Sequence, residues 1–248
     1  MAKKKKQKAT HSYFKDSYNL HAKVGSYDGG ACLSGHLYKW TARNSCSYRW
    51  QGIKKAKENP TPYDSHGKAY CHLNGAGFPA LAVLGIKNFN NGFMPYSNQV
   101  HHVLPNSVLR NGIDETTKSK ANLIKDICDG LLTEKYNINF KDNMLILAVK
   151  WKDACQIGLP THLGDHPGYS AKIKARVIKA LQPYAQVVDD EEDHDEPDYL
   201  DLKDELKAIS DSMYGAIVAH GQTSIKGSCS SAPVSVNQLP ASVYAVLL

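Results

Sequence analysis

The sequence predicts an α+β protein. Two short apolar runs, residues 98–105 and 144–149, have the length and composition of buried strands. Two runs with apolar residues at helical spacing, 117–132 and 169–181, alternate with these strands along the chain. With 248 residues, the chain is long enough to bury a sizeable core, either as one large domain or as a larger domain with a smaller companion.

The composition is that of an ordinary globular protein, with 42% hydrophobic and 22% charged residues. No apolar run approaches the ~18 residues that cross a bilayer, so we expect no membrane-spanning segment and no membrane partner. Residues 1–10 are rich in lysine and no apolar run follows them, so an ordinary secretory signal is not expected either. The sequence therefore predicts a protein that is cytoplasmic in the producing cell, unless another export route carries it out.

The charge is unevenly distributed. The formal net charge is +6, but residues 189–205 contain eleven acidic residues and a single lysine, so the rest of the chain has 29 basic and 13 acidic residues. A surface this basic attracts polyanions by releasing their counterions, and nucleic acid is the commonest polyanion. Lysine also serves simply to keep a protein in solution, so charge alone leaves both interpretations open.

Residues 1–85 predict a basic tail followed by a β-rich extension. The segments 36–40 and 46–50 have aromatic residues at alternate positions, as in strands, and they flank a turn sequence at Asn44-Ser45. In the second segment Tyr48 and Trp50 enclose Arg49, a pattern of packed sheet faces and, less often, of surfaces that stack nucleobases. Residues 54–67, which include two prolines, predict a loop at a subdomain boundary.

His101 and His102 lie side by side in the first predicted strand. Alternation along a strand points neighbouring side chains to opposite faces, so one imidazole can ligate a metal while the other meets a substrate. With eleven histidines in the chain, an isolated pair arises readily by chance, so the residues that follow carry more weight. Asn143 stands at a turn before the second strand, and His162 and His166 come just before the second helix.

The C-terminal part of the chain predicts one more helix, over residues 202–220, where apolar residues recur at helical spacing. The acidic residues before it form either a cover for a basic surface or, more simply, a solvated linker. Residues 221–248, rich in serine, predict a less ordered end whose final apolar residues can still pack. The six cysteines include no Cys-x-x-Cys pair, so we expect reduced thiols.

Taken together, the motifs around these histidines resemble the AHH family of the HNH/endonuclease VII superfamily. The resemblance rests on Val100-His101-His102-Val103-Leu104-Pro105, then Ile138-Asn139 and Asn143, then His162-x3-His166-Pro167-x-Tyr169. These are ββα-metal (His-Me finger) nucleases, common as toxin domains of bacterial polymorphic toxins and secretion-system effectors. The resemblance covers about residues 86–182, with Val100 where the family usually has alanine. It implies a nuclease domain at 86–182, behind the extension at 1–85 and ahead of an acidic segment, helix and tail at 183–248.

The resemblance also implies roles for the polar residues. His102 is the expected general base, and Asn143 is expected to orient it through a hydrogen bond. His101, His166 and His162 are the expected ligands of one divalent metal ion. Hydrolysis of a phosphodiester needs a base for the attacking water and a cation for the charge on the leaving oxygen, so the residue types suit the reaction.

The identity of the third ligand and of the metal stays open in the sequence. Pro167 indicates that the helix begins near His166, so His162 need not lie one helical turn from it, and Asp165 or Asp142 is an alternative oxygen ligand. Three imidazoles suit Zn²⁺ or Ni²⁺, whereas one or two imidazoles with water also suit Mg²⁺ or Mn²⁺.

For the substrate, the resemblance implies DNA, with RNA as the alternative. Candidate phosphate contacts, each equally well explained as a solvated helix charge, are Arg110, Lys172, Lys174 and Arg176. The family further implies an antibacterial toxin effector with a cognate immunity protein and a secretion-system carrier, which leaves the producer by contact-dependent secretion and acts in the target-cell cytoplasm. The alternative from another class is a non-catalytic nucleic-acid-binding module whose histidines hold a structural metal.

Overall fold

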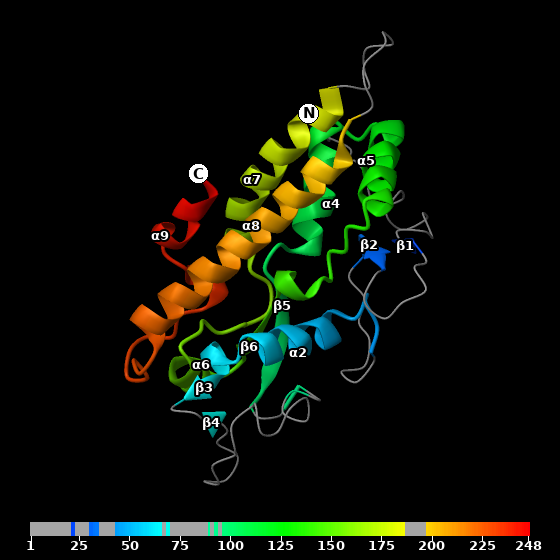
Figure 1. The fold of residues 1–248 in the computed structure, drawn as a ribbon. Helices are drawn as coiled ribbons and strands as arrows, with labels where there is room; N and C mark the ends of the chain where they lie inside the picture. Colours follow the sequence, from blue (N-terminus) through cyan, green and yellow to red (C-terminus); the bar gives the residue numbers. More distant parts are fainter. Residues whose placement is uncertain are drawn as a thin grey trace, which may run out of the picture.

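The computed structural model describes residues 21–22, 30–34, 43–65, 68–69, 89, 92–93, 96–186 and 197–248. In these ranges long helices surround short strands, which form two-stranded antiparallel sheets (Figure 1). The architecture is therefore α+β, as the sequence predicts. None of the described helices is long and apolar enough to span a membrane.

The described strands are all short. They are β1 (His21–Ala22), β2 (Ala31–Cys32), β3 (Asp64–Ser65), β4 (Lys68–Ala69), β5 (Asn98–His102) and β6 (Met144–Ala148). The α-helices are α2 (Tyr48–Glu58), α4 (Asn106–Thr116), α5 (Ala121–Thr133), α6 (Trp151–Ile157), α7 (Pro167–Gln186), α8 (Tyr199–His220) and α9 (Ala241–Tyr244). Shorter helical turns are η1 (Thr61–Tyr63), η3 (Lys141–Asn143), η4 (Gly221–Ile225), η5 (Val236–Gln238) and η6 (Ala245–Leu247).

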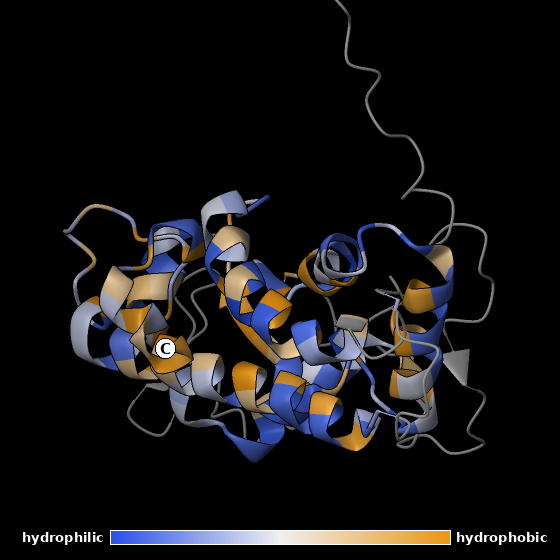
Figure 2. Cartoon of the chain, turned by 90° about the horizontal axis from the view of Figure 1, so that it is seen from above, coloured by the Kyte–Doolittle hydropathy of each residue, from blue (hydrophilic) through white to orange (hydrophobic). Residues whose placement is uncertain are grey.

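The sheet that matters for the site is the antiparallel pair β5 and β6. Its register places Asn98 opposite Ala148 and His102 opposite Met144. Both strands lie where the apolar runs predict them. Every residue of β6 is buried, because helices cover the pair from several directions. Apolar and polar residues form separate stripes on the surrounding helices (Figure 2).

Helix α2 replaces the strand predicted at residues 46–50, so that prediction is wrong. Ser47 caps the helix by accepting a hydrogen bond from the Trp50 amide at 3.3 Å. The helix then packs closely on the sheet at Gly52, where an added Cβ would come 2.8 Å from a Val100 methyl carbon. Tertiary packing against the sheet has therefore overridden the local aromatic alternation. The partner strand predicted at 36–40 falls outside the described residues.

The middle of the chain contains one helix that the sequence predicts and one that it does not. The helix predicted at 117–132 is confirmed as α5, although it begins later, at Ala121. The preceding helix α4 begins directly after Pro105 and packs along α7. Gly112 permits this close packing, since an added Cβ would lie 3.0 Å from a methyl carbon of Val177.

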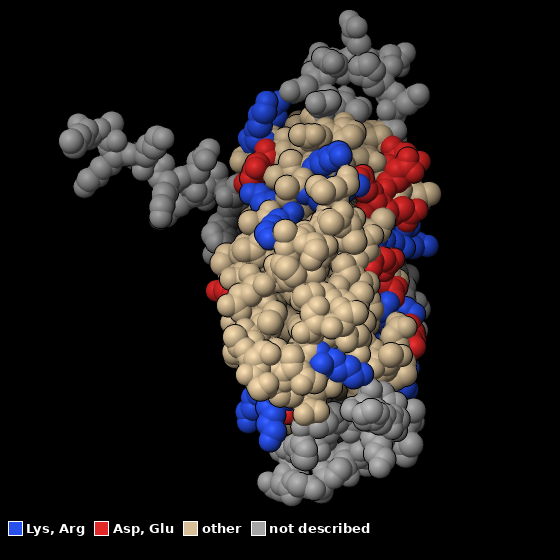
Figure 3. All heavy atoms as spheres, turned by 90° about the vertical axis from the view of Figure 1, so that its left-hand side faces the viewer, with Lys and Arg blue, Asp and Glu red and all other residues tan. Residues whose placement is uncertain are grey.

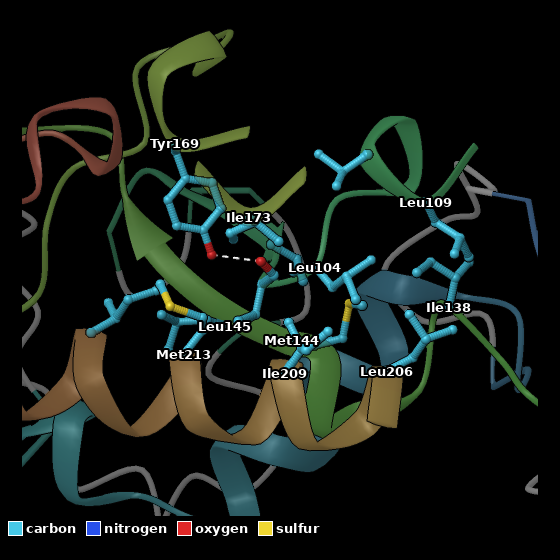
Figure 4. Close-up of a cluster of buried hydrophobic side chains, with 14 of the residues drawn as sticks. Leu104, Leu109, Ile138, Met144, Leu145, Tyr169, Ile173, Leu206, Ile209 and Met213 are labelled. Atoms are coloured by element: carbon cyan, nitrogen blue, oxygen red, sulfur yellow. Dashed lines mark hydrogen bonds between the residues drawn. The ribbon is translucent and has the colours of Figure 1, made fainter. Parts of the chain in front are cut away.

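Helices α7 and α8 close the core over the sheet. Helix α7 begins at Pro167, as predicted, and α8 is capped by Asp198, which accepts a hydrogen bond from the Leu200 amide at 2.8 Å. Figure 4 shows side chains of α8 reaching the strands, with Leu206 and Ile209 close to Met144, and Met213 close to Leu145. The apolar spacing that predicts the helix at 202–220 is thus the spacing of its buried face.

Two expectations about the C-terminal end and the cysteines are wrong. Residues 221–248 are not loosely ordered but form η4, η5, α9 and η6, with Val236 and Val243 buried. Cys155 on α6 forms a disulfide bond with Cys229 in this segment, whereas Cys32 and Cys128 are free thiols, as predicted. The two bonded cysteines are 74 positions apart, so no local spacing revealed the pair.

Candidate metal centre

Three imidazoles meet at one end of the β5–β6 pair. His101 comes from β5, His162 from the loop that follows α6, and His166 from the residue just before α7. One ring nitrogen from each lies within 4.8 Å of the others. The ring centroids are 4.7 Å apart for His101 and His166, and 5.2 Å for His101 and His162. This spacing suits three nitrogen ligands of a single ion.

The environment of the cluster fits a metal ion. His101 is only 1% exposed, and neither of its ring nitrogens has a hydrogen-bond partner among the described residues. The Nδ1 atom of His162 is also buried without such a partner. Buried polar atoms are almost always satisfied, so the unpaired ring nitrogens of His101 and His162 fit a cation bound between the rings, with one nitrogen of each ring as its ligand.

Burial also prepares the imidazoles as ligands by keeping them neutral. It lowers the pKa of His101 well below 6.5, and repulsion from the neighbouring imidazoles adds to this effect. Burial and the proximity of His166 lower the pKa of His162 to about 4. The pKa of His166 is lowered by burial as well. A metal binds the neutral imidazole, so these ligands need no deprotonation at pH 7.

The local fold explains how the ligands come together. Helix α6 ends at Gly158, whose φ of +67° is the left-handed conformation that glycine favours at a helix end. The chain then turns back to the sheet, where the His162 amide donates a hydrogen bond to the Ala148 carbonyl at 3.0 Å. On the other side of the loop Tyr169 is fully buried, and its hydroxyl donates a hydrogen bond to the Val103 carbonyl (Figure 4).

His102 has different neighbours from His101, as strand alternation predicts. Its Nε2 atom lies 3.0 Å from the side-chain oxygen of Asn139, and its ring centroid lies 5.1 Å from that of Tyr48. The Asn139 amide group donates to the Ser34 carbonyl at 2.8 Å, which turns its oxygen toward His102. Nε2 of His102 must therefore carry the proton, and Nδ1 is left as the proton acceptor.

The predicted hydrogen bond from Asn143 to His102 is not formed, because the Asn143 amide is used elsewhere. Its oxygen accepts from the Leu104 amide at 2.6 Å and from the Ser210 hydroxyl at 3.0 Å. Its amide group donates to the carbonyls of Leu104 and Ile138. Asn143 thus ties the end of β5 to the start of β6 and to α8. Asn139 occupies the position next to His102 that the sequence assigned to Asn143.

The other predicted residues divide between the site and the surface. Asp142 pairs with Lys55 at 2.6 Å and Asp165 is exposed, so neither alternative oxygen ligand belongs to the cluster. The predicted phosphate contacts mostly have partners of their own. Lys174 pairs with Glu115, Arg176 with Glu205 at 2.7 Å, Lys172 lies over the Tyr244 ring at 4.2 Å, and Arg110 lies 3.4 Å from the Asn106 side-chain oxygen.

A groove of about 680 Å³ runs beside β5 and reaches His162. Its described lining includes Tyr48 and Arg49 from the first turn of α2, Gln99 from β5 and Phe93, which is 73% exposed. The guanidinium of Arg49 lies 5.8 Å from the Tyr48 ring centroid. The sequence indicates that Tyr48 and Arg49 could form a base-stacking pattern. Because it predicts a strand there, it does not predict that they lie on a helix beside the histidines.

The fold and the cluster together define an α+β protein with a candidate three-histidine metal centre. A model of the AHH family, described as a nuclease family of the HNH/ENDO VII superfamily with conserved AHH, matches residues 84–211, about half of the chain. The chain therefore belongs to the AHH family of nucleases. No curated protein and no solved structure matches it.

Proposed function

We propose that this protein is a metal-dependent endonuclease with a ββα-metal core, in which β5, β6 and α7 frame the site. The observation that supports it best is the cluster of three imidazoles at the end of β5, with a fourth imidazole, His102, next to His101 in the strand. A structural metal site does not need a neighbouring histidine such as His102, whose tautomer is fixed by the Asn139 side-chain amide. A hydrolase needs one as its base.

In the proposed mechanism His101, His162 and His166 hold the ion. A bound divalent cation stabilises the charge that develops on the phosphate and on the leaving oxygen. His102 accepts the proton of the attacking water at Nδ1, and Asn139 keeps that atom unprotonated by accepting from Nε2. Three imidazoles favour Zn²⁺ or Ni²⁺ over Mg²⁺, which prefers oxygen ligands and retains its water.

The substrate we propose is DNA, bound along the groove beside β5. Arg49 supplies a phosphate contact there, and Tyr48 and Phe93 offer aromatic surfaces. The surface that includes the C-terminal residues is a poor alternative site for DNA. Figure 3 shows a broad surface with few charges, and residues 227–248 contain no Lys, Arg, Asp or Glu. Phosphate backbones are attracted to basic surfaces, so this neutral face is not the one that meets the polymer.

The biological role that fits the family is an antibacterial toxin effector. We propose that the protein is exported through a secretion-system carrier, cuts DNA in the cytoplasm of the target cell and is neutralised in the producer by an immunity protein. This role rests on the known use of AHH domains, whereas the catalytic proposal also rests on the geometry of the histidines.

Cleavage of supercoiled plasmid by wild-type protein and by His102→Ala tests the proposal. With Zn²⁺, Ni²⁺, Mn²⁺ or Mg²⁺ supplied in turn, we expect the wild type to nick and linearise the plasmid and a chelator to stop it. The variant should lose at least ~100-fold in rate, the usual cost of removing a general base. A parallel assay with single-stranded RNA separates the DNase from an RNase of the same fold.

A non-catalytic binding module with a structural metal is the competing function. It predicts that His102→Ala binds DNA and metal as the wild type does and that neither protein cuts any nucleic acid. Wild-type protein that binds metal and DNA but leaves plasmid and RNA intact with every metal would establish the module and refute the nuclease.

A further inference from the structure

We propose that the C-terminal segment, residues 221–244, is a clamp that positions two of the three metal ligands, with Asn237 as its positioning residue. The segment lies beyond residues 84–211, which the family model matches. The inference rests on the proposed metal centre and adds to it the part of the chain that holds the ligand loop in place.

The first contact of the clamp is at the start of α7. The side-chain oxygen of Asn237 accepts hydrogen bonds from the amides of Gly168, at 2.7 Å, and Tyr169, at 3.3 Å. The first amides of a helix have no acceptor within the helix, and the residue just before it normally caps them. Here that residue is His166, whose ring is directed to the metal cluster. Asn237, which is distant in the sequence, caps the helix instead and leaves the His166 ring available as a metal ligand.

The fit at this contact is close. A Cβ atom at Gly168 would lie 3.0 Å from the Asn237 oxygen, so a larger residue would require the Asn237 side chain to shift from its contact with the helix. The ring of Tyr244 packs 6.1 Å from that of Tyr169, centroid to centroid, and Tyr169 is itself 5.4 Å from His166. The clamp therefore contacts the backbone of Gly168 and the side chain of Tyr169, which follow His166 in the chain.

The second contact of the clamp is at His162. The preceding residue, Thr161, donates its amide to the Val234 carbonyl at 2.9 Å and accepts from the Val236 amide at 3.0 Å. This bridge is parallel and pairs Thr161 with Ser235. Since the His162 amide is bonded to Ala148, the backbone of this ligand is fixed between the sheet on one side and the clamp on the other.

The third contact anchors the clamp to α6. Cys229 forms the disulfide bond with Cys155, and the Gly227 amide donates to the Cys155 carbonyl at 2.8 Å. Gln222 donates its side-chain amide to the carbonyls of Ile157 and Gly158, the residues that end α6. The loop that carries His162 and His166, together with the start of α7, is thus held at its beginning, its middle and its end by one segment.

Zn²⁺ affinity measured by chelator competition tests the clamp on the full-length protein. We expect Asn237→Ala to weaken affinity about tenfold, as loss of outer contacts to metal ligands usually does. Asn237→Asp keeps an acceptor oxygen and should stay within about threefold of the wild type. Ser242→Ala, an exposed position on the same segment, is the matched control and should bind as the wild type does. The absorption spectrum of Co²⁺-loaded protein should change for Asn237→Ala alone, since it reports ligand geometry rather than stability.

Hydrogen exchange of the metal-free wild type provides a test without any variant. The amides of Gly168 and Tyr169 should be protected, because Asn237 is their acceptor. Wild-type Zn²⁺ affinity in a folded Asn237→Ala protein, or exchange at these two amides at the unprotected rate, would overturn the clamp. A wild type that binds no metal would refute the metal centre and the clamp with it. A wild type that binds metal but cuts nothing would refute only the nuclease.

Discussion

At the scale of single residues, two asparagines four positions apart have different functions. Asn139 holds the tautomer of His102, whereas Asn143 makes four hydrogen bonds that join β5, β6 and α8. Both lie in buried surroundings, and the sequence assigned the hydrogen bond with His102 to Asn143, whereas the structure has it at Asn139. The Ser34 carbonyl accepts a hydrogen bond from the Asn139 amide group and so directs the Asn139 oxygen toward His102.

We expect Asn143→Ala to lower the free energy of unfolding by about 3 kcal/mol or more, because the buried Leu104 amide and the carbonyls of Leu104 and Ile138 each lose a hydrogen bond. Asn139→Ala should cost less stability but reduce plasmid cleavage at least ~10-fold, because His102 loses its orientation. Urea unfolding and initial cleavage rates, both taken where each variant is folded, measure the two effects. The opposite ranking in both assays would return the orienting role to Asn143.

The histidine cluster should make the metal-free protein sensitive to acid. The pKa of His162 is about 4 in the folded protein, below its ordinary value of 6.5, so the unfolded chain takes up a proton first as the pH falls. Stability is therefore full above about pH 6.5 and is lost as the pH falls toward 4. For His162 this loss is about 1–3 kcal/mol.

The urea midpoint of metal-free protein at pH 7.5 and pH 5 measures this dependence. His162→Gln should flatten it, since the substituted side chain does not titrate. A wild-type midpoint that is the same at both pH values would mean that the cluster is open to water rather than buried.

At the scale of elements, the disulfide between α6 and the C-terminal segment should contribute much of the stability. It closes a sequence separation of 74 residues, and bonds of this kind typically contribute about 2–4 kcal/mol. We expect a phosphine reductant to lower the urea midpoint of the wild type accordingly. The double variant Cys155→Ala with Cys229→Ala should unfold at the reduced midpoint whether or not the reductant is present. An unchanged wild-type midpoint, with both thiols shown to be reduced by mass, would contradict this.

The elements also show what the sequence can reveal. Apolar runs with a clear period, such as β6 and the buried face of α8, are predicted correctly because burial itself creates the period. Helix α2 is missed because its aromatic residues alternate over the first turn and its identity depends on the sheet beneath Gly52. The C-terminal segment is missed because hydrogen bonds to distant backbone groups, as at Asn237, leave no local pattern.

At the scale of the whole molecule, the order of histidines along the chain predicted the family and the three members of the cluster. His101, His162 and His166 do lie together, although the loop rather than a helical turn separates the last two. The phosphate contacts were harder to predict, because a charge on a helix face is explained equally well by a nearby carboxylate. Arg176 illustrates this, since its ion pair with Glu205 depends on how α7 and α8 pack.

Two parts of the site come from outside the residues that the family model matches. Tyr48 on α2 contacts the ring of His102 from the N-terminal side, and Asn237 reaches the start of α7 from the C-terminal side. A fragment cut at residues 84 and 211 would therefore contain every histidine of the cluster and still be an incomplete unit. An exchange of such domains between proteins, whether by recombination or by engineering, would have to include the chain from α2 to α9 to keep both contacts.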